Sequence, residues 1–260
     1  MAGIYIHIPF CTSKCRYCDF TSYPGKIGFA DAYMACVYKE MKLRSAELKN
    51  KTCDTVYIGG GTPSVIDGKW IVGCMNQVRA CYSLSPDAEV TIELNPGTVT
   101  EEKVRAYKRA GVNRFSIGLQ TAVDAQLEEL GRRHTAADFV NTCKLLGDVN
   151  KSADIMIGLK GQTLADIRAS IDLAAGQVVS HISMYALTPE DGTPIYTDYL
   201  NGELPDSDEV AALYDGARAY LKQLGFARYE VSNFAKEGFE SRHNLNYWRR
   251  GEYIGFGVSA

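Results

Sequence analysis

Three cysteines near the amino terminus have the spacing of a metal-binding loop. Cys11, Cys15 and Cys18 follow the pattern C-x3-C-x2-C, whereas the other five of the chain's eight cysteines are scattered. In a reduced chain, such a tight group of thiols indicates metal or redox chemistry rather than disulfides. A short loop can present three thiolates to one inorganic cluster, and a [4Fe–4S] cluster normally takes four. Because Asp19 and Phe20 follow in place of a fourth ligand, we expect one iron to stay open to an exogenous ligand.

A structural zinc site and simple coincidence are the alternatives to a cluster at these cysteines. A zinc site would require a fourth Cys or His and usually contains C-x2-C pairs. The nearest histidine, His7, lies upstream in an expected strand. Both alternatives stay open at the level of spacing alone.

The glycine-rich segment Gly59-Gly60-Gly61-Thr62 follows an apolar run and is a second candidate for ligand contact. Glycines allow backbone groups to approach a ligand closely. The segment is not a P-loop, because no Gly-Lys-Ser/Thr follows, and Ser64 takes the place of the third glycine in the dinucleotide-binding pattern. A tight strand–helix turn is the alternative interpretation.

Polar side chains occur at or near the ends of three expected strands. Glu93 ends one, Gln120 follows the next and Asp154 lies in the third. The carboxyl ends of parallel strands are where ligand groups gather on an α/β scaffold. We therefore expect the three side chains to share one ligand surface. The alternative for Glu93 is a solvent-exposed carboxylate at the rim of the fold.

The sequence His243-Asn244-Leu245-Asn246-Tyr247-Trp248 combines a histidine with aromatic rings. Histidine can bind haem iron, and aromatic rings suit a porphyrin face. Ordinary packing of a histidine beside Tyr and Trp accounts for the same pattern on physical grounds.

The composition indicates a globular protein without a net positive charge. The chain has 260 residues, of which 46% are hydrophobic and 23% charged, and its net charge is −3. This charge does not favour recruitment of nucleic acid. No apolar run has the length of a membrane span, and the start lacks the pattern of a signal peptide. We expect a cytoplasmic protein.

Short apolar runs alternate with segments of helical period, which predicts an α/β fold. The segment 27–49 is expected to be helical, with Phe29, Tyr33, Val37 and Met41 on its apolar face. Six strand–helix units are too few for an eight-fold barrel, so a partial (β/α)6 barrel or an open doubly wound sheet would fit. The expected strands are Ile4–Ile8, Thr55–Ile58, Ala88–Leu94, Arg114–Gly118, Ala153–Ile157 and His181–Ala186.

The character of the chain changes near residue 187. We expect residues 1–187 to form the barrel and residues 188–260 to begin a second, carboxyl-terminal region. A helix is predicted from Asp206 to Leu224, and a strand at Ala227–Val231. The last eight residues are apolar and glycine-rich, unlike a typical terminus, so we expect this region to be truncated.

These motifs together resemble the radical S-adenosylmethionine (SAM) superfamily. More narrowly, they are similar to the oxygen-independent coproporphyrinogen III oxidases and to their sister group, the HemW-type haem chaperones. The resemblance spans nearly the whole chain and rests on Ile6–Phe20, Gly59–Pro63, Glu93–Pro96, Phe115–Gln120, Asp154–Thr163 and His243–Trp248.

The resemblance implies a SAM molecule bound to the open iron. Gly60, Gly61 and Thr62 would receive its amino group, and Gln120 and Asp154 its ribose hydroxyls. Glu93 would contact another part of SAM. The remaining assignments are Arg132 for the carboxylate, Tyr5 near the sulfonium and, from the chaperone group, His243 for haem.

Two of these assignments have alternatives. A guanidinium suits a carboxylate, and by chemistry alone either Arg132 or Arg133 could serve, although the family spacing favours Arg132. Tyr5 could equally be a packing residue of the barrel.

Two functions are consistent with this resemblance. The first is a haem-binding chaperone that keeps the cluster and SAM site and delivers haem to a recipient protein. The second is a coproporphyrinogen III oxidase that decarboxylates propionates through a 5′-deoxyadenosyl radical. Both need a cellular electron donor to reduce the cluster, and a radical SAM enzyme acting on another tetrapyrrole is a third possibility.

Position 20 favours the chaperone. The oxidases resemble C-x3-C-x2-C-x-C, whereas this chain has Phe20 at the position of the last cysteine, as the chaperone group does. The chain also begins almost at its first strand, whereas the oxidases typically carry an amino-terminal extension that contributes to their substrate site.

Overall fold

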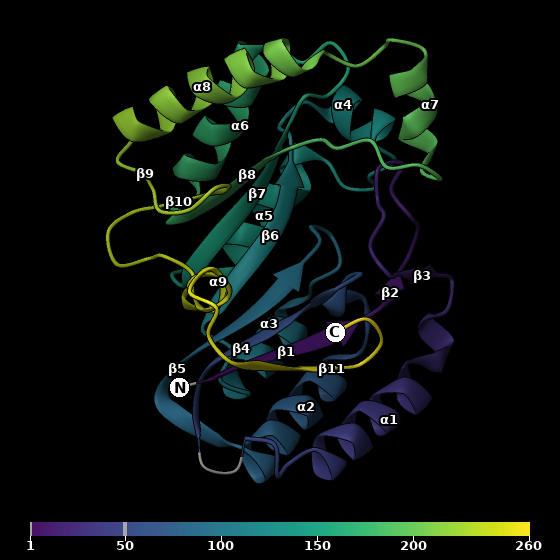
Figure 1. Ribbon diagram of the computed structural model, residues 1–260, viewed down its shortest axis with the longest axis vertical. Coiled ribbons are helices and arrows are strands. Elements are labelled where there is room, and N and C mark those ends of the chain that lie inside the picture. The colour runs from purple at the N-terminus through teal and green to yellow at the C-terminus, as the bar shows by residue number, and fades with distance from the viewer. Residues whose placement is uncertain (1, 49–50) are drawn as a thin grey trace.

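The computed structural model describes residues 2–48 and 51–260. Within these residues the chain folds into one nine-stranded sheet, a separate two-stranded sheet and the helices that cover the larger sheet (Figure 1). None of the helices in the described part combines the length and apolar character that a membrane crossing requires.

Six parallel strands form the centre of the large sheet. They occur in the sheet in the same order as in the sequence, and each pairs with the next in parallel register. The strands are β1 (Ala2–Ile8), β4 (Thr52–Gly60), β5 (Ser83–Leu94), β6 (Arg114–Gln120), β7 (Asn150–Ile157) and β8 (His181–Ala186). All six expected strands are therefore confirmed, most of them with longer bounds.

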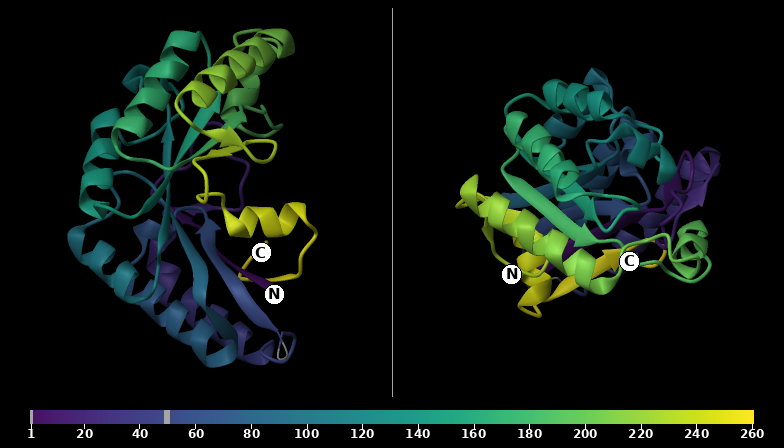
Figure 2. Two further views of the ribbon diagram at one scale, coloured as in Figure 1. Left: turned by 90° about the vertical axis from the view of Figure 1, so that its left-hand side faces the viewer. Right: turned by 90° about the horizontal axis from the view of Figure 1, so that it is seen from above.

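Helices follow the strands and cover one face of the curved sheet (Figure 2). Right-handed crossovers that always advance in one direction place every helix on the same side, as in a barrel. A doubly wound sheet would require a reversal of strand order, and the observed order has none among these six strands. The helices are α1 (Ala30–Leu43), α2 (Gly68–Cys81), α3 (Glu101–Arg109), α4 (Asp124–Glu129), α5 (Ala136–Leu146) and α6 (Leu164–Gly176).

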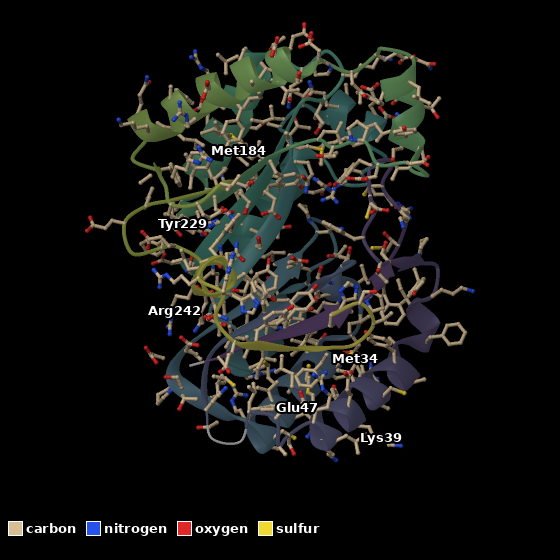
Figure 3. The ribbon with its side chains drawn as sticks, viewed as in Figure 1. Met34, Lys39, Glu47, Met184, Tyr229 and Arg242 are labelled. Atoms are coloured by element: carbon tan, nitrogen blue, oxygen red, sulfur yellow. The ribbon has the colours of Figure 1, made fainter. Side chains whose placement is uncertain are left out.

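The core lies between this helical layer and the sheet. On β1, Ile4 and Ile6 point into the helical layer and are fully buried. Met34 of α1 is also buried, whereas Lys39 of the same helix points away from the sheet (Figure 3). The alternate positions of the strands face the concave side of the sheet and carry polar side chains, among them Tyr5, Tyr57, Glu93 and Asp154.

Two details of the helix predictions were wrong. Phe29 is 63% exposed because it lies in the short helix η1 (Ile27–Phe29) just before α1, and Met34 packs in the core instead. Helix α1 ends at Leu43, and residue 49, the predicted end, lies outside the described residues.

The segment after residue 187 adds strands to both edges of the same sheet, beside β8 and beside β1. Helices α7 (Pro194–Leu200) and α8 (Ser207–Gln223) lead to β9 (Ala227–Arg228) and β10 (Asn233–Ala235), and β10 pairs with β8 antiparallel. The predicted strand at Ala227–Val231 is therefore shorter than expected.

Helix α9 (Arg242–Trp248) lies on the concave side of the sheet, across from the layer formed by α1 to α6 (Figure 2). Strand β11 (Tyr253–Phe256) then adds to the free edge of β1 in parallel orientation. The division of the chain near residue 187 remains a prediction.

Candidate functional site: a cysteine loop at the carboxyl ends of the strands

The cysteine loop follows β1 directly and lies above the carboxyl ends of the strands. Strand β2 (Phe10–Cys11) opens the loop and pairs with β3 (Tyr23–Pro24), which closes it. Cys11 is buried, Cys15 and Cys18 are half-buried, and all three thiols are free. Burial raises the pKa of the Cys11 thiol, so the thiolate form needs a positive partner such as a metal.

The glycine-rich turn after β4 packs tightly against this loop. The backbone N–H of Gly61 donates to the carbonyl of Ile8 at 2.9 Å, and that of Thr62 donates to the carbonyl of Phe10 at 2.8 Å. A Cβ on Gly61 would lie 2.9 Å from the Phe10 carbonyl oxygen and 3.0 Å from Sγ of Cys11. The absence of a side chain at Gly61 is what allows the turn to approach the cysteine loop.

Two carboxylates lie below the loop, on β5 and β7, the strands on either side of β6. Glu93 accepts hydrogen bonds from the Tyr57 hydroxyl at 2.9 Å and from the backbone N–H of Gly60 at 3.1 Å. Burial and the nearby charge of Asp154 raise the pKa of Glu93 to about 7. Burial also raises the pKa of Asp154, which accepts a hydrogen bond from Ser116 at 3.2 Å. Such a pair suits the hydroxyl or ammonium groups of a ligand.

Gln120 has an uncommon backbone conformation at the end of β6. Its φ is 68°, a value that residues other than glycine rarely adopt, and the β6–β7 register shifts just before it. The side chain is 4% exposed, and the Tyr185 hydroxyl donates to its Oε1 at 2.6 Å. Backbone strain of this kind concentrates at ligand sites, where the surroundings hold the residue in place.

Arg132 contacts three elements of the site. Its Nη2 donates to the Gly118 carbonyl at 2.8 Å and to Oδ1 of Asn95 at 3.0 Å, and its Nη1 donates to Sγ of Cys15 at 3.7 Å. Arg133 is exposed and does not line the pocket. Of the two arginines that the sequence left open, the structure brings Arg132 to the cysteines.

One pocket at the carboxyl ends of the strands collects most of the predicted residues. It brings together every predicted cluster and SAM residue except Tyr5. The members are Cys11, Cys15, Cys18, Gly60, Gly61, Thr62, Glu93, Gln120, Arg132 and Asp154.

Tyr5 lies deeper on the concave face and does not line this pocket. Its hydroxyl pairs with Nδ1 of His7 at 3.1 Å, and its ring stacks on Tyr57 at a centroid distance of 6.2 Å. These contacts are those of a packing residue beneath the site.

His243 also lies apart from the pocket. It is 1% exposed, with Nδ1 paired to the Thr55 hydroxyl at 2.8 Å and Nε2 to the Tyr247 hydroxyl at 3.0 Å. Burial, together with the positive charge of Arg114, lowers the pKa of His243 to about 4, so the imidazole is neutral near pH 7. Iron can reach Nε2 only if the Tyr247 hydroxyl leaves it.

Several lining residues were missed by the sequence analysis. Tyr17, Asn95 and Tyr185 all line the pocket. Asn95 follows β5 directly, two positions after Glu93, and this position at a strand's carboxyl end was the signal that could have identified it.

The residues present fit an iron–sulfur cluster with an open iron and a bound anion. Three free thiols line one pocket, and the buried Nε of Arg132 has no hydrogen-bond partner within the described residues. In the same part of the chain, no three His, Cys, Asp or Glu side chains meet as a site for a single ion. A cluster does not need such a meeting point, because its thiolates bind different iron atoms.

Comparison with known proteins agrees with this arrangement. Residues 5–174 match the family profile described as the radical SAM superfamily. A protein named heme chaperone HemW from Buchnera aphidicola subsp. Schizaphis graminum is 37% identical over 261 residues, which cover 99% of this chain and 69% of that protein. The Escherichia coli K12 protein of the same name is 38% identical, with 99% and 69% covered.

Among solved structures, coproporphyrinogen III oxidase (HemN) from Escherichia coli superposes with a TM-score of 0.86. The match covers 100% of this chain and 64% of that one at 20% sequence identity. At this identity the likeness establishes the fold alone.

Proposed function

Because this chain belongs to the radical SAM superfamily and, within it, to the HemW family, we propose that it is a haem-binding radical SAM protein that passes haem to a recipient. The observation that carries the proposal is the convergence of Cys11, Cys15 and Cys18 with Arg132 on one pocket. In this proposal the three thiolates hold a [4Fe–4S] cluster, and SAM lies beside it.

The residues of the pocket have distinct tasks toward SAM. Arg132, fixed by Gly118 and Asn95, offers its free Nε to a carboxylate. Glu93 and Asp154 accept hydrogen bonds from ligand donors, and Gln120 is held by Tyr185. When bound, the reduced cluster and SAM supply one-electron cleavage of a C–S bond. The surrounding protein orients the ligand and excludes water.

Haem binding is proposed at α9. The relatives above are named heme chaperones, and His243 is the candidate iron ligand. Around this buried histidine the surface is aromatic: Tyr247 is 39% exposed, Trp248 57% and Tyr253 51%, and the rings of Tyr247 and Tyr253 meet edge to face at 4.8 Å. Exposed aromatic rings supply a platform for a porphyrin face.

An oxidase acting on coproporphyrinogen III is the second candidate function. The E. coli oxidase shares the fold, and a shared fold is compatible with either function. Phe20 disfavours the oxidase, because this ring occupies the position of the oxidases' additional cysteine. The ring is 71% exposed and lines the pocket beside the three cysteines.

Electron donor, haem recipient and location complete the proposal. The cluster requires a cellular one-electron donor, and haem delivery requires a recipient protein. A reducing compartment such as the cytoplasm suits the protein, because thiolate ligands must stay reduced.

One experiment separates the two functions. Anaerobically reconstituted protein is given dithionite, SAM and coproporphyrinogen III, and protoporphyrinogen is followed by chromatography while haem is titrated in parallel by absorbance. Stoichiometric haem binding without product supports the chaperone. Product formation over many turnovers supports the oxidase. If neither haem binding nor product formation is observed, both functions are excluded.

A further inference from the structure

A chain of hydrogen bonds connects two of the three cysteine sulfurs through Asn95. Sγ of Cys11 lies 3.5 Å from Oγ1 of Thr62, and Nδ2 of Asn95 donates to the same Oγ1 at 2.8 Å. On its other side, Oδ1 of Asn95 accepts from Nη2 of Arg132 at 3.0 Å, while Nη1 of Arg132 donates to Sγ of Cys15 at 3.7 Å. We call this chain of five residues the Asn95 relay: Cys11, Thr62, Asn95, Arg132 and Cys15.

The chemistry of the groups sets the direction of every hydrogen in the relay. A guanidinium has donors only, so the amide of Asn95 must present its oxygen to Arg132 and its NH2 to Thr62. The amide NH2 then occupies an acceptor position of the Thr62 oxygen, which leaves the Thr62 hydroxyl hydrogen for Cys11. A metal-bound thiolate can only accept, so both ends of the relay point donors at sulfur.

Asn95 connects the two halves of the relay, one of which leads through Thr62 to Cys11 and the other through Arg132 to Cys15. It lies directly after β5, while Cys11 ends β2, Thr62 follows β4 and Arg132 follows α4. Its backbone is held by the Ser64 hydroxyl, which accepts from the Asn95 N–H at 3.3 Å. One amide therefore orients both groups that face the cysteines.

We propose that Asn95 is a positioning residue that sets the hydrogen bonding at Cys11 and Cys15 and thereby the reduction potential of the cluster. The inference rests on the cluster of the proposed function. Reduction adds negative charge to the thiolates and sulfides, and donors directed at the sulfurs stabilise that charge. Loss of the relay makes the cluster harder to reduce.

The test compares Asn95→Ala with wild type and with Asn113→Ala. Asn113 is a matched control, because its amide also makes two hydrogen bonds. Its Oδ1 accepts from the Val90 N–H at 2.8 Å and its Nδ2 donates to the Ala88 carbonyl at 2.8 Å, beside the middle of β5 and outside the pocket. Each protein is reconstituted anaerobically, its iron and sulfide are measured, and its midpoint potential is determined by EPR-monitored redox titration.

We expect Asn95→Ala to lower the ratio of reduced to oxidised cluster at a fixed potential about tenfold, which corresponds to about 59 mV for a one-electron couple. Asn113→Ala should leave the potential unchanged, even if it lowers stability. An Asn95→Ala cluster with the wild-type potential overturns the proposal.

The contact between Thr62 and Cys11 provides a second test, with a substitution that is nearly isosteric. Thr62→Val removes only the hydroxyl and should also make the potential more negative, whereas Thr62→Ser keeps the hydroxyl and should restore it. The shift of the Asn95→Ala/Thr62→Val double variant should be smaller than the sum of the single shifts, because part of the effect of Asn95 acts through the Thr62 hydroxyl. If Asn95→Ala does not fold, an unchanged potential in Thr62→Val overturns the relay.

The wild-type protein separates this inference from the proposed function. If wild type assembles no four-iron cluster, the proposed function fails and the relay fails with it. If wild type assembles the cluster and the potentials of Asn95→Ala and Thr62→Val match it, the relay alone fails.

Discussion

Nη1 of Arg132 donates a hydrogen bond to Sγ of Cys15 across 3.7 Å, although the two residues are 117 positions apart in the chain. The neighbouring Tyr17 and Cys15 raise the pKa of Arg132 and outweigh the opposing effect of burial. A permanent positive charge therefore stands beside the cysteine loop, where thiolates and an anionic ligand would gather.

Replacing this arginine should weaken SAM binding. We expect Arg132→Met in the reconstituted protein to lose at least about tenfold in SAM affinity, since a hydrogen bond to a charged group contributes about 1.5–3 kcal/mol. Arg133→Met is the matched control and should bind SAM as wild type does, because Arg133 is exposed and outside the pocket. Isothermal titration calorimetry measures both. Equal affinities for Arg132→Met and wild type would remove Arg132 from the site.

The raised pKa of Glu93 predicts a pH-dependent stability of the cluster-free protein. The pKa rises from 4.5 to about 7 on folding, so between these values the folded protein holds a proton that the unfolded chain releases. The burial of Glu93 therefore costs more free energy as the pH rises through this range, by up to about 3 kcal/mol.

Glu93→Gln should remove this contribution. We expect the variant to be more stable than wild type at pH 8 and similar at pH 4.5, as measured by denaturant unfolding of the cluster-free protein. Asp154 leaves a residual slope, because burial raises its pKa as well. Glu102→Gln, at an exposed position of α3, is the control. If the stability of Glu93→Gln depended on pH in the same way as that of wild type, the raised pKa of Glu93 would be contradicted.

A methyl group on Gly61 should disturb the cysteine loop. The new Cβ would meet the Phe10 carbonyl oxygen at 2.9 Å and Sγ of Cys11 at 3.0 Å, so the turn must move. We expect Gly61→Ala to lose about 1–3 kcal/mol of stability and to bind less iron on reconstitution. Gly28→Ala is the control, since a Cβ there meets nothing within 4 Å. Full iron content in Gly61→Ala would show that the close approach is not needed.

Tyr247 should compete with haem iron for His243. Its hydroxyl pairs with Nε2 of His243 at 3.0 Å, so Tyr247→Phe frees that nitrogen while keeping the aromatic ring. We expect Tyr247→Phe to bind haem more tightly than wild type and His243→Ala to bind it more weakly, in titrations followed by absorbance. If neither variant changes haem affinity, the haem ligand lies elsewhere.

The strands and the cysteine loop could be predicted because their signals are local. Strand β8, for example, is a short segment in which Ile182 and Met184 are buried, and its predicted bounds match the structure. The loop's spacing from Cys11 to Cys18 is also contained within a few residues. The site residues Glu93, Gln120 and Asp154 share the pocket because parallel strands end at one edge of the sheet.

Features that depend on long-range contacts were not predicted. Strand β11 is short and contains Gly255, and it is a strand only because β1 offers a free edge. The role of Asn95 arises from contacts with Thr62 and Arg132, which are 33 and 37 positions away. Its position after β5 indicates a residue of the site, but no local pattern predicts which side chains it contacts. For the same reason the burial of His243 could not be predicted from its aromatic neighbours.

Mössbauer spectroscopy of protein reconstituted with ⁵⁷Fe, with and without SAM, tests the central claim most directly. The claim is that Cys11, Cys15 and Cys18 hold a [4Fe–4S] cluster with one open iron beside Arg132. We predict a four-iron spectrum in which SAM changes the parameters of a single iron site. A spectrum that SAM leaves unchanged at every iron, or a Cys15→Ala variant that still assembles the full cluster, would contradict the account.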